Sequence, residues 1–168
     1  MRNRQGAEYA HLSGLAKRIA ILPVAALALG GGAPLPQTAT TGKAAKVVVT
    51  VTNLRNADGV VLACMTASEK NFPKCRGVAG TKSSRVEAHE GRLTLTFEDV
   101  PPGNYAIALL HDENANGRAD RALGMMPREG FGFSRDAPVR MGPPAFHDAE
   151  FGIGTQDRSM TIRMRYML

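Results

Sequence analysis

The segment that most constrains the fold is residues 105–110, Tyr-Ala-Ile-Ala-Leu-Leu, which is apolar on both faces of a β-strand. The turn sequence Pro101-Pro102-Gly103-Asn104 precedes it, and the polar residues 112–120 follow it. A strand with two apolar faces must be covered from both sides. Turn, strand and polar loop in this order predict the central strand of an antiparallel sandwich, with the polar loop at one end of the sheets.

Alternation of apolar and polar residues, which is typical of half-buried strands, recurs along the chain. It is cleanest in three segments, whose inward residues are expected to be Val47, Val49 and Val51; Leu93, Leu95 and Phe97; and Met160, Ile162, Met164 and Tyr166. Residues 60–65 and 146–151 are also expected to be strands, and residues 85–88 a weaker one. No stretch after residue 45 has a helical period. The Gly- and Pro-rich residues 124–134 predict an ordered, packed loop.

These segments predict an all-β fold, a single antiparallel β-sandwich of immunoglobulin or transthyretin type with seven to eight strands. Residues 46–168 would form it, which is enough chain for one domain with a substantial core. The turn at residues 56–59, Asn-Ala-Asp-Gly, is expected to join the first two strands as a hairpin, because its glycine can adopt a positive φ.

The N-terminus predicts a signal peptide over residues 1–32. A basic segment ending in Lys17-Arg18 precedes an apolar run over residues 19–29, and small residues follow. The run is too short to span a bilayer, which takes about 20 residues. The alternative is an uncleaved N-terminal anchor, which would be the only membrane contact. Residues 33–45 predict a flexible linker, and the expected location is periplasmic or secreted.

Cys64 and Cys75 are the only two cysteines. In an exported chain an even number of cysteines favours a disulfide, and this one would close a short loop with a stabilisation of roughly 3 kcal/mol. The spacing fits neither a zinc knuckle nor a Cys-x-x-Cys redox pair.

The charge pattern gives no support for nucleic-acid binding. Of the 21 basic and 15 acidic residues, four basic and one acidic precede residue 43, which lowers the net charge from +6 to +3 for the rest of the chain. The remaining basic residues are scattered and lack the interleaved aromatics of a nucleic-acid footprint.

The polar residues 112–120 are the best candidate for a metal site, with Ca²⁺ as the cofactor. Oxygen-bearing side chains recur at every second position and a glycine permits a tight reversal, as in calcium loops. Ligands would come from Asp112, Asn114, Asn116, Asp120 and the carbonyl of Arg118. Leu123 occupies the position where a calcium loop places its Glu, so binding would be weak, roughly 10⁻⁴–10⁻³ M. The alternative is a metal-free turn in which the Asn and Asp side chains cap their own backbone.

An enzyme is not expected. His111 and His147, with Asp148 and Glu150, would be the residues of a metal-dependent hydrolase, but their spacing does not bring them together. Structural histidines are the favoured interpretation. Ser134 lacks the Gly-x-Ser-x-Gly setting of a hydrolase nucleophile.

Phe131, Phe133 and Ser134, together with Met125 and Met126, are a candidate ligand-binding loop, because flexible Met and exposed aromatic side chains can grip a partner. The favoured interpretation is that these side chains fold down onto the core, as such residues in Gly-rich loops more often do.

Three separated segments carry a family resemblance. They are residues 109–120, Leu-Leu-His-Asp-Glu-Asn-Ala-Asn-Gly-Arg-Ala-Asp; residues 124–134, Gly-x-x-Pro-Arg-Glu-Gly-Phe-Gly-Phe-Ser; and residues 142–149, Gly-Pro-Pro-Ala-Phe-His-Asp-Ala. With Phe72-Pro73-Lys74-Cys75, they resemble the bacterial domain-of-unknown-function family 2141 over roughly residues 46–166. The resemblance implies a small exported β-sandwich with no established activity. The expected function is a non-enzymatic binding or structural module that contacts an envelope protein or glycan.

Overall fold

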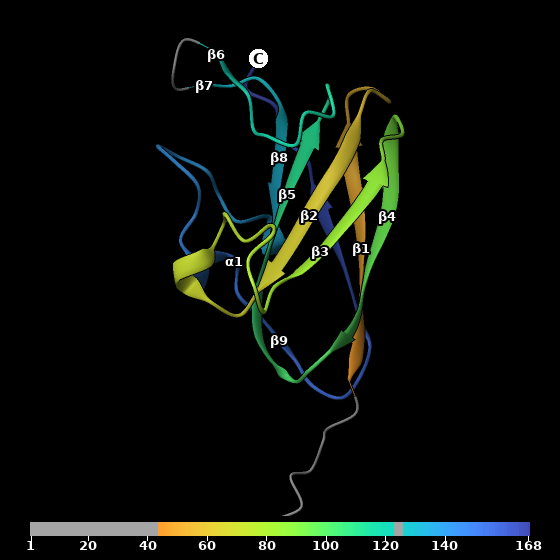
Figure 1. Cartoon of the computed structure of the whole chain (residues 1–168), viewed down its shortest axis with the longest axis vertical. Helices are drawn as coiled ribbons and strands as arrows, with labels where there is room; N and C mark the ends of the chain where they lie inside the picture. The colour runs from red at the N-terminus through yellow and green to blue at the C-terminus, as the bar shows by residue number, and fades with distance from the viewer. Residues whose placement is uncertain (1–43, 123–125) are drawn as a thin grey trace, which may run out of the picture. The chain divides into compact units, whose positions relative to one another are not determined.

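The computed structural model describes residues 44–122 and 126–168, which form a mostly β protein with several sheets (Figure 1). The predicted signal peptide and residues 33–43 of the predicted linker lie outside the described residues. Within the described part, the two larger sheets contribute apolar side chains to one shared core. The prediction of a β-rich fold is therefore confirmed.

The first sheet has the strand order β10–β1–β4, with bounds Arg158–Arg163 for β10, Ala45–Leu54 for β1 and Gly91–Val100 for β4. Every second residue of β1 faces the core, where Val47, Val49 and Val51 are fully buried. They lie opposite the inward residues of β4, which are Phe97, Leu95 and Leu93. The predicted alternation is confirmed in both strands.

β10 pairs with the other edge of β1, and its inward residue Ile162 lies opposite Val51. This pairing is parallel, so the expectation of a purely antiparallel arrangement is wrong. Local alternation predicts which face of a strand is buried but carries no information on the direction of its neighbour.

The second sheet has the order β3–β2–β5–β8, with bounds Lys82–Glu87 for β3, Val60–Thr66 for β2, Gly103–Asp112 for β5 and Gly130–Phe133 for β8. β5 is paired on both edges, and a short strand β9, Phe151–Ile153, pairs with its first residues. The segment 105–110 is therefore central, as predicted. Ile107 and Leu109 point into the shared core, whereas Ala106 belongs to a second apolar cluster on the opposite face.

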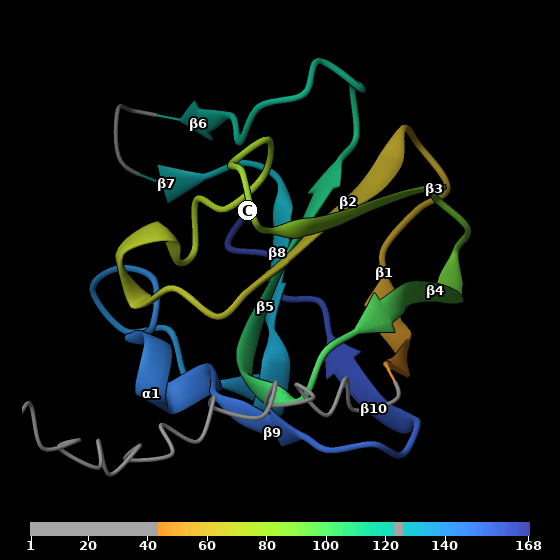
Figure 2. The same cartoon turned by 60° about the horizontal axis from the view of Figure 1, so that its bottom comes forward.

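The outer face of this sheet is partly covered by connecting segments (Figure 2). These contain three short helical elements and a small two-stranded sheet, with bounds Glu69–Asn71 for η1, Ser134–Asp136 for η2, Phe146–Ala149 for α1, Arg121–Ala122 for β6 and Met126–Pro127 for β7. Both views place η1 and α1 on the side of β2, β5 and β8 that faces away from β1 and β4.

The predicted hairpin of residues 47–52 and 60–65 is wrong, because β1 and β2 lie in different sheets. Both edges of β1 are occupied by β4 and β10, so β2 pairs with β3 and β5 instead. The connection passes against the end of β5. Gly59 has the expected positive φ of 64°, and a Cβ on it would lie 2.0 Å from the backbone oxygen of Asp112.

Residues 130–133 form strand β8 rather than part of a loop, which corrects the expectation for this Gly-rich segment. The glycines allow a close approach to the C-terminal segment. A Cβ on Gly130 would lie 2.3 Å from the ring of Tyr166, and one on Gly132 would lie 2.9 Å from Ile162. Glycine here makes room for neighbouring side chains and does not interrupt the strand.

Residues 146–149 form the single-turn helix α1 rather than a strand, and β9 begins only at Phe151. The apolar alternation in so short a segment also fits one helical turn, because Phe146 and Ala149 are three residues apart and share a face. Both side chains pack on the outer face of the second sheet, in the cluster that contains Ala106 and Phe133.

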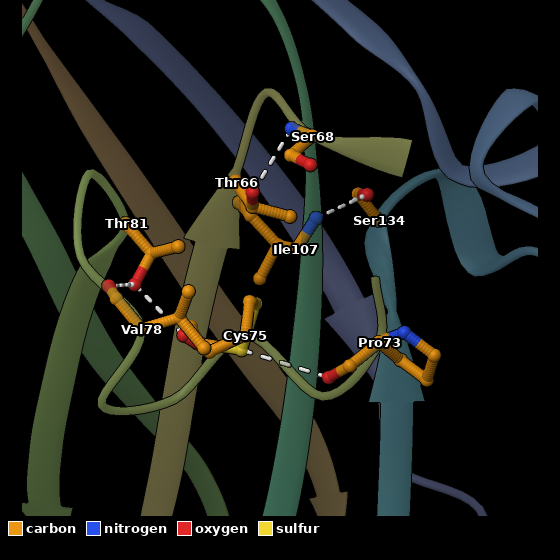
Figure 3. The surroundings of a disulfide bond; sticks show 9 residues. Thr66, Ser68, Pro73, Cys75, Val78, Thr81, Ile107 and Ser134 are labelled. Carbon is orange, nitrogen blue, oxygen red and sulfur yellow. Dashed lines mark hydrogen bonds between the residues drawn. A yellow bond between two sulfur atoms is a disulfide. The ribbon is translucent and has the colours of Figure 1, made fainter. Parts of the chain in front are cut away.

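The predicted disulfide is confirmed. Cys64 of β2 is bonded to Cys75, with their Cα atoms 5.7 Å apart. The bond holds the segment between β2 and β3 against the outer face of the sheet (Figure 3). The same segment is ordered locally by Thr81, whose hydroxyl donates to the carbonyl oxygens of Cys75 and Val78 at 2.7 and 2.6 Å.

Candidate functional site

An apolar surface on the outer face of the second sheet is left open by the connecting segments. Its floor consists of two rows of side chains that run across β2, β5 and β8, namely Leu62, Leu110 and Phe131 in one row and Cys64, Ala108 and Phe133 in the next. Alternation along each strand places these residues on the face opposite the shared core. Leu110 and Phe131 are only half-buried.

Four segments form walls around this floor and border an open hollow of about 950 Å³, which we call the outer-face hollow. The walls are residues 73–76 next to the disulfide, residues 117–121, residues 126–129, and residues 139–143. Three exposed methionines, Met126, Met141 and Met167, line it with exposed fractions of 43%, 104% and 44%. Met125, which the sequence also suggested for a gripping surface, lies outside the described residues.

The rim of the outer-face hollow is predominantly basic. Five exposed cations line it, namely Lys74, Arg76, Arg118, Arg121 and Arg140. None of them takes part in the ion pairs found between described side chains. Among the described residues of the lining, two are acidic, Asp120 and Glu129, and Glu129 is buried. The hollow therefore combines an apolar floor with a rim that favours negative charge.

The structure separates the residues of the candidate ligand-binding loop. Phe131 and Phe133 line the outer-face hollow, but Ser134 is completely buried. The Ser134 hydroxyl accepts a hydrogen bond from the backbone N–H of Ile107 at 2.9 Å and donates to the carbonyl oxygen of Ala149 at 2.5 Å. It thereby links β5 to α1 and leaves no group to offer a ligand. Figure 3 shows the hydrogen bond between Ser134 and Ile107.

Residues 112–120 form a tight loop at the end of β5, in which the candidate ligands bind the loop itself. The Asp112 carboxylate accepts the N–H groups of Asn116 and Gly117 at 3.0 and 2.7 Å. The side-chain oxygens of Asn114 and Asn116 accept the N–H two residues further on. Gly117 adopts a φ of 79°. The side chains thus cap the backbone, as the metal-free alternative expects.

Asp120 closes the loop. One of its carboxylate oxygens accepts the side-chain amides of Asn114 and Asn116 at 2.7 and 3.0 Å, and its N–H donates to Glu129 at 3.0 Å. Within the described ranges, no three His, Cys, Asp or Glu side chains are grouped so as to hold a metal ion by themselves. A cation at this loop would depend on the amide and carbonyl oxygens of Asn114, Asn116 and Arg118.

Glu129 is a residue of this site that sequence reasoning missed. It is 4% exposed, and its Oε1 has no hydrogen-bond partner among the residues that the structure describes. Burial raises the pKa of Glu129, the hydrogen bond from the Asp120 N–H opposes this, and the nearby carboxylates of Asp112, Asp120 and Glu113 add to the rise. The sequence signal was the position of Glu129 between the loop and the apolar Phe-Gly-Phe segment, but it lies nine positions after Asp120 in the chain.

The two histidines lie in different parts of the fold. His111 is fully buried, with Nδ1 2.7 Å from the Tyr166 hydroxyl and Nε2 2.9 Å from the carbonyl oxygen of Asp58. His147 is exposed on α1, beside Asp148. α1 packs near Ala106, and His111 lies five residues further along β5, roughly 16 Å at 3.3 Å per residue. The structure does not bring the two imidazoles together.

Arg55 connects the start of the 112–120 loop to the C-terminal segment. Its guanidinium binds the Glu113 carboxylate with two hydrogen bonds of 2.7 and 2.5 Å and lies 4.5 Å from the centroid of the Tyr166 ring. The hydrogen bonds from Arg55 lower the pKa of Glu113, and one from Asn56 lowers it further against the opposing effect of burial.

We expect Glu113→Gln to lower the free energy of unfolding at pH 7 by about 1 kcal/mol, because the pair is only partly exposed and doubly hydrogen-bonded. The pKa of Glu113 is lower in the folded state, so its contribution is complete above pH 4.5, the ordinary pKa, and is lost as pH falls through the folded-state pKa. Urea unfolding of both proteins from pH 7 to pH 3 checks this. Glu87→Gln, in an exposed pair, is the control and should change little at any pH.

In the described part of the chain, no helix has the length and apolar character needed to cross a membrane. No curated protein and no solved structure matches the chain. The family model described as "Uncharacterized protein conserved in bacteria (DUF2141)" matches residues 49–161. This range contains β2 to β9, the outer-face hollow's floor and the 112–120 loop. The chain therefore belongs to the DUF2141 family of uncharacterised bacterial proteins.

Proposed function

We propose that the protein is an exported, non-catalytic binding module of the bacterial cell envelope, with one sandwich domain after a signal peptide. We further propose that the outer-face hollow binds an envelope molecule with an apolar body and an anionic end. The observation that carries the proposal is the apolar floor under a rim of five cations. Export is supported by the basic-then-apolar N-terminal sequence and by the disulfide, since disulfides persist in oxidising compartments.

The apolar floor favours an aliphatic or aromatic ligand body. Ligand pockets commonly have volumes of about 300–1,000 Å³ and mostly apolar linings, and the hollow of about 950 Å³ falls in this class. The exposed methionines Met126, Met141 and Met167 add flexible, polarisable side chains that can adapt to a chain-like ligand. A bare glycan offers too little apolar surface for such a floor, so we infer a lipid-like amphiphile.

The basic rim favours an anionic end group. Arg and Lys side chains lie on several separate wall segments, so they could contact the negative charge of a ligand from more than one side. Among them, Arg76 is held in place by a hydrogen bond from its guanidinium to the carbonyl oxygen of Gly117. Arginine forks suit carboxylate and phosphate groups in particular.

We expect the full chain to bind laurate and to bind dodecanol and dodecyltrimethylammonium more weakly, because only laurate satisfies both floor and rim. Isothermal titration calorimetry below the micelle-forming concentrations measures this. Each shortening of the fatty acid by two methylenes should weaken binding roughly tenfold, at about 0.8 kcal/mol per buried methylene.

The double variant Arg76→Glu/Arg140→Glu should weaken laurate binding about tenfold and leave dodecanol binding nearly unchanged. Arg92→Glu is the matched control, since Arg92 is an exposed arginine of β4 in the other sheet. The proposal fails if no amphiphile binds, if laurate and the cationic amphiphile bind equally well, or if the control variant weakens laurate as much as the double variant does.

A further inference from the structure

The 112–120 loop matches the ligand spacing of a calcium loop at five positions. Oxygen donors are spaced at the first, third, fifth, seventh and ninth places, and the glycine of the sixth place, Gly117, has the positive φ of the sharp turn. Loop geometry alone does not distinguish a metal site from a self-capped turn. The pattern also lacks the acidic residue that normally completes the ligand set from the twelfth place.

Glu129 supplies an independent observation. It is 96% buried, given its exposed fraction of 4%. Its Oε2 accepts the N–H of Asp120, whereas Oε1 has no hydrogen-bond partner within residues 44–122 and 126–168. A buried carboxylate oxygen without a hydrogen-bond partner is costly, and the neighbouring carboxylates of Asp112 and Asp120 add to the cost. These three carboxylates do not form a metal cluster by themselves. A divalent cation bound between the loop and Glu129, with amide and carbonyl oxygens as further ligands, would offset that cost by balancing their charge.

We propose that the protein binds Ca²⁺ between the 112–120 loop and Glu129, with Glu129 replacing the missing acidic ligand of the loop. The donors are the side-chain oxygens of Asp112, Asn114, Asn116, Asp120 and Glu129 and the carbonyl of Arg118. All six are oxygens, the ligands that hard cations prefer. Each amide oxygen that now accepts one N–H keeps a second lone pair for a metal.

Calcium is favoured over magnesium because the donors come from an irregular loop and from a separate segment before β8, which makes a regular octahedral set difficult to assemble. Ca²⁺ accepts six to eight oxygens in variable geometry, whereas Mg²⁺ demands a near-octahedral set and keeps several waters. Three carboxylates, instead of the two within the loop, place the affinity near the tight end of the extracellular class, about 10⁻⁴ M. The calcium proposal does not rest on the proposed ligand, although Arg118, Asp120 and Glu129 also line the outer-face hollow.

The test is a calcium titration of the full chain after treatment with a chelator, followed by thermal unfolding and by calorimetry. At about 100-fold excess over the dissociation constant, calcium should raise the melting temperature by about 5–10 °C, and magnesium should raise it much less. Glu129→Gln should weaken calcium binding at least about tenfold. Without calcium, the same variant should melt at a higher temperature than the wild type, because the amide removes a buried charge.

Two further variants provide a second ligand substitution and a control outside the site. Asn116→Ala removes one donor from an exposed side chain and should weaken calcium binding several-fold if Glu129→Gln fails to fold. Glu90→Gln removes an exposed carboxylate outside the site and should leave the calcium response unchanged. Calcium that leaves the wild-type melting temperature unchanged overturns the proposal. So does a Glu129→Gln variant that keeps the wild-type calcium affinity, since Glu129 would then have only a structural role.

Discussion

Replacing Gly59 with alanine is expected to lower the free energy of unfolding by about 3 kcal/mol or more. The added Cβ would lie 2.0 Å from the backbone oxygen of Asp112 and 2.7 Å from backbone atoms of Glu113. Real Cβ atoms do not approach so closely, and backbone atoms cannot rotate away as a side chain can. The variant therefore combines overpacking, which costs about 1–3 kcal/mol, with a left-handed φ of 64° that costs an L-residue about 1–2 kcal/mol.

Gly91→Ala is the control for Gly59→Ala. Gly91 has an even larger positive φ of 84°, but no atom lies within 4 Å of the Cβ that alanine would add. This variant isolates the backbone cost, and we expect a loss of only about 1–2 kcal/mol. Urea unfolding of the two variants at the same pH measures the difference. Equal losses would show that the contact between the β1–β2 connection and the end of β5 is not tight.

Removal of the disulfide is the second change with a large expected effect. The Cys64→Ala/Cys75→Ala variant should lose about 3 kcal/mol, since the bond closes a loop with a sequence separation of 11 residues. The same loss is expected when wild type is unfolded in a reducing agent, and the double variant should not respond to that agent. Both cysteines are buried, so a small packing loss from the missing sulfur atoms adds to it.

The loss of the disulfide should also reach the outer-face hollow. Pro73, Lys74 and Arg76 form one wall, and Cys75 anchors this wall to β2. We expect weaker laurate binding by the reduced protein under conditions in which it is still folded. If reduction changes the free energy of unfolding by less than about 1 kcal/mol, the segment between β2 and β3 is held by its other contacts and not by the bond.

The burial of individual strands could be predicted from the sequence because alternation is a local signal. Val47, Val49 and Val51 face the core because successive side chains of a strand point to opposite sides. The disulfide could be predicted for a similar reason, since only two cysteines were present to be paired. The first inference needed only residues that are close in the chain. The second needed no choice of partner, because two cysteines allow one pairing.

The pairing of strands could not be predicted, because it depends on competition between distant segments. A turn sequence at residues 56–59 favours a hairpin locally, but β4 and β10 occupy both edges of β1. Likewise, Gly130 and Gly132 favoured a loop in the sequence. In the structure they are part of a strand, because a larger side chain at either position would collide with Tyr166 or Ile162.

Local sequence patterns indicated some residues that line the outer-face hollow but not its basic rim. Phe131 and Phe133 were expected near a ligand, and both line the outer-face hollow, but the cations of its rim come from segments that no local pattern connects. Ser134 was expected beside them. However, β8 ends at Phe133, and the Ser134 hydroxyl in η2 points inward, where it forms hydrogen bonds to β5 and α1. Glu129 reaches the 112–120 loop only because the short β6–β7 sheet returns the chain to the end of β5.

The most direct test of the proposed binding surface uses methionine methyl groups as probes in nuclear magnetic resonance. Met126, Met141 and Met167 line the outer-face hollow, whereas Met65 and Met164 are buried in the shared core. Our account predicts that laurate shifts the methyl signals of the first three and leaves those of the two core methionines in place. Unshifted signals from Met126, Met141 and Met167 at saturating laurate, or equal shifts at Met65 and Met164, would contradict it.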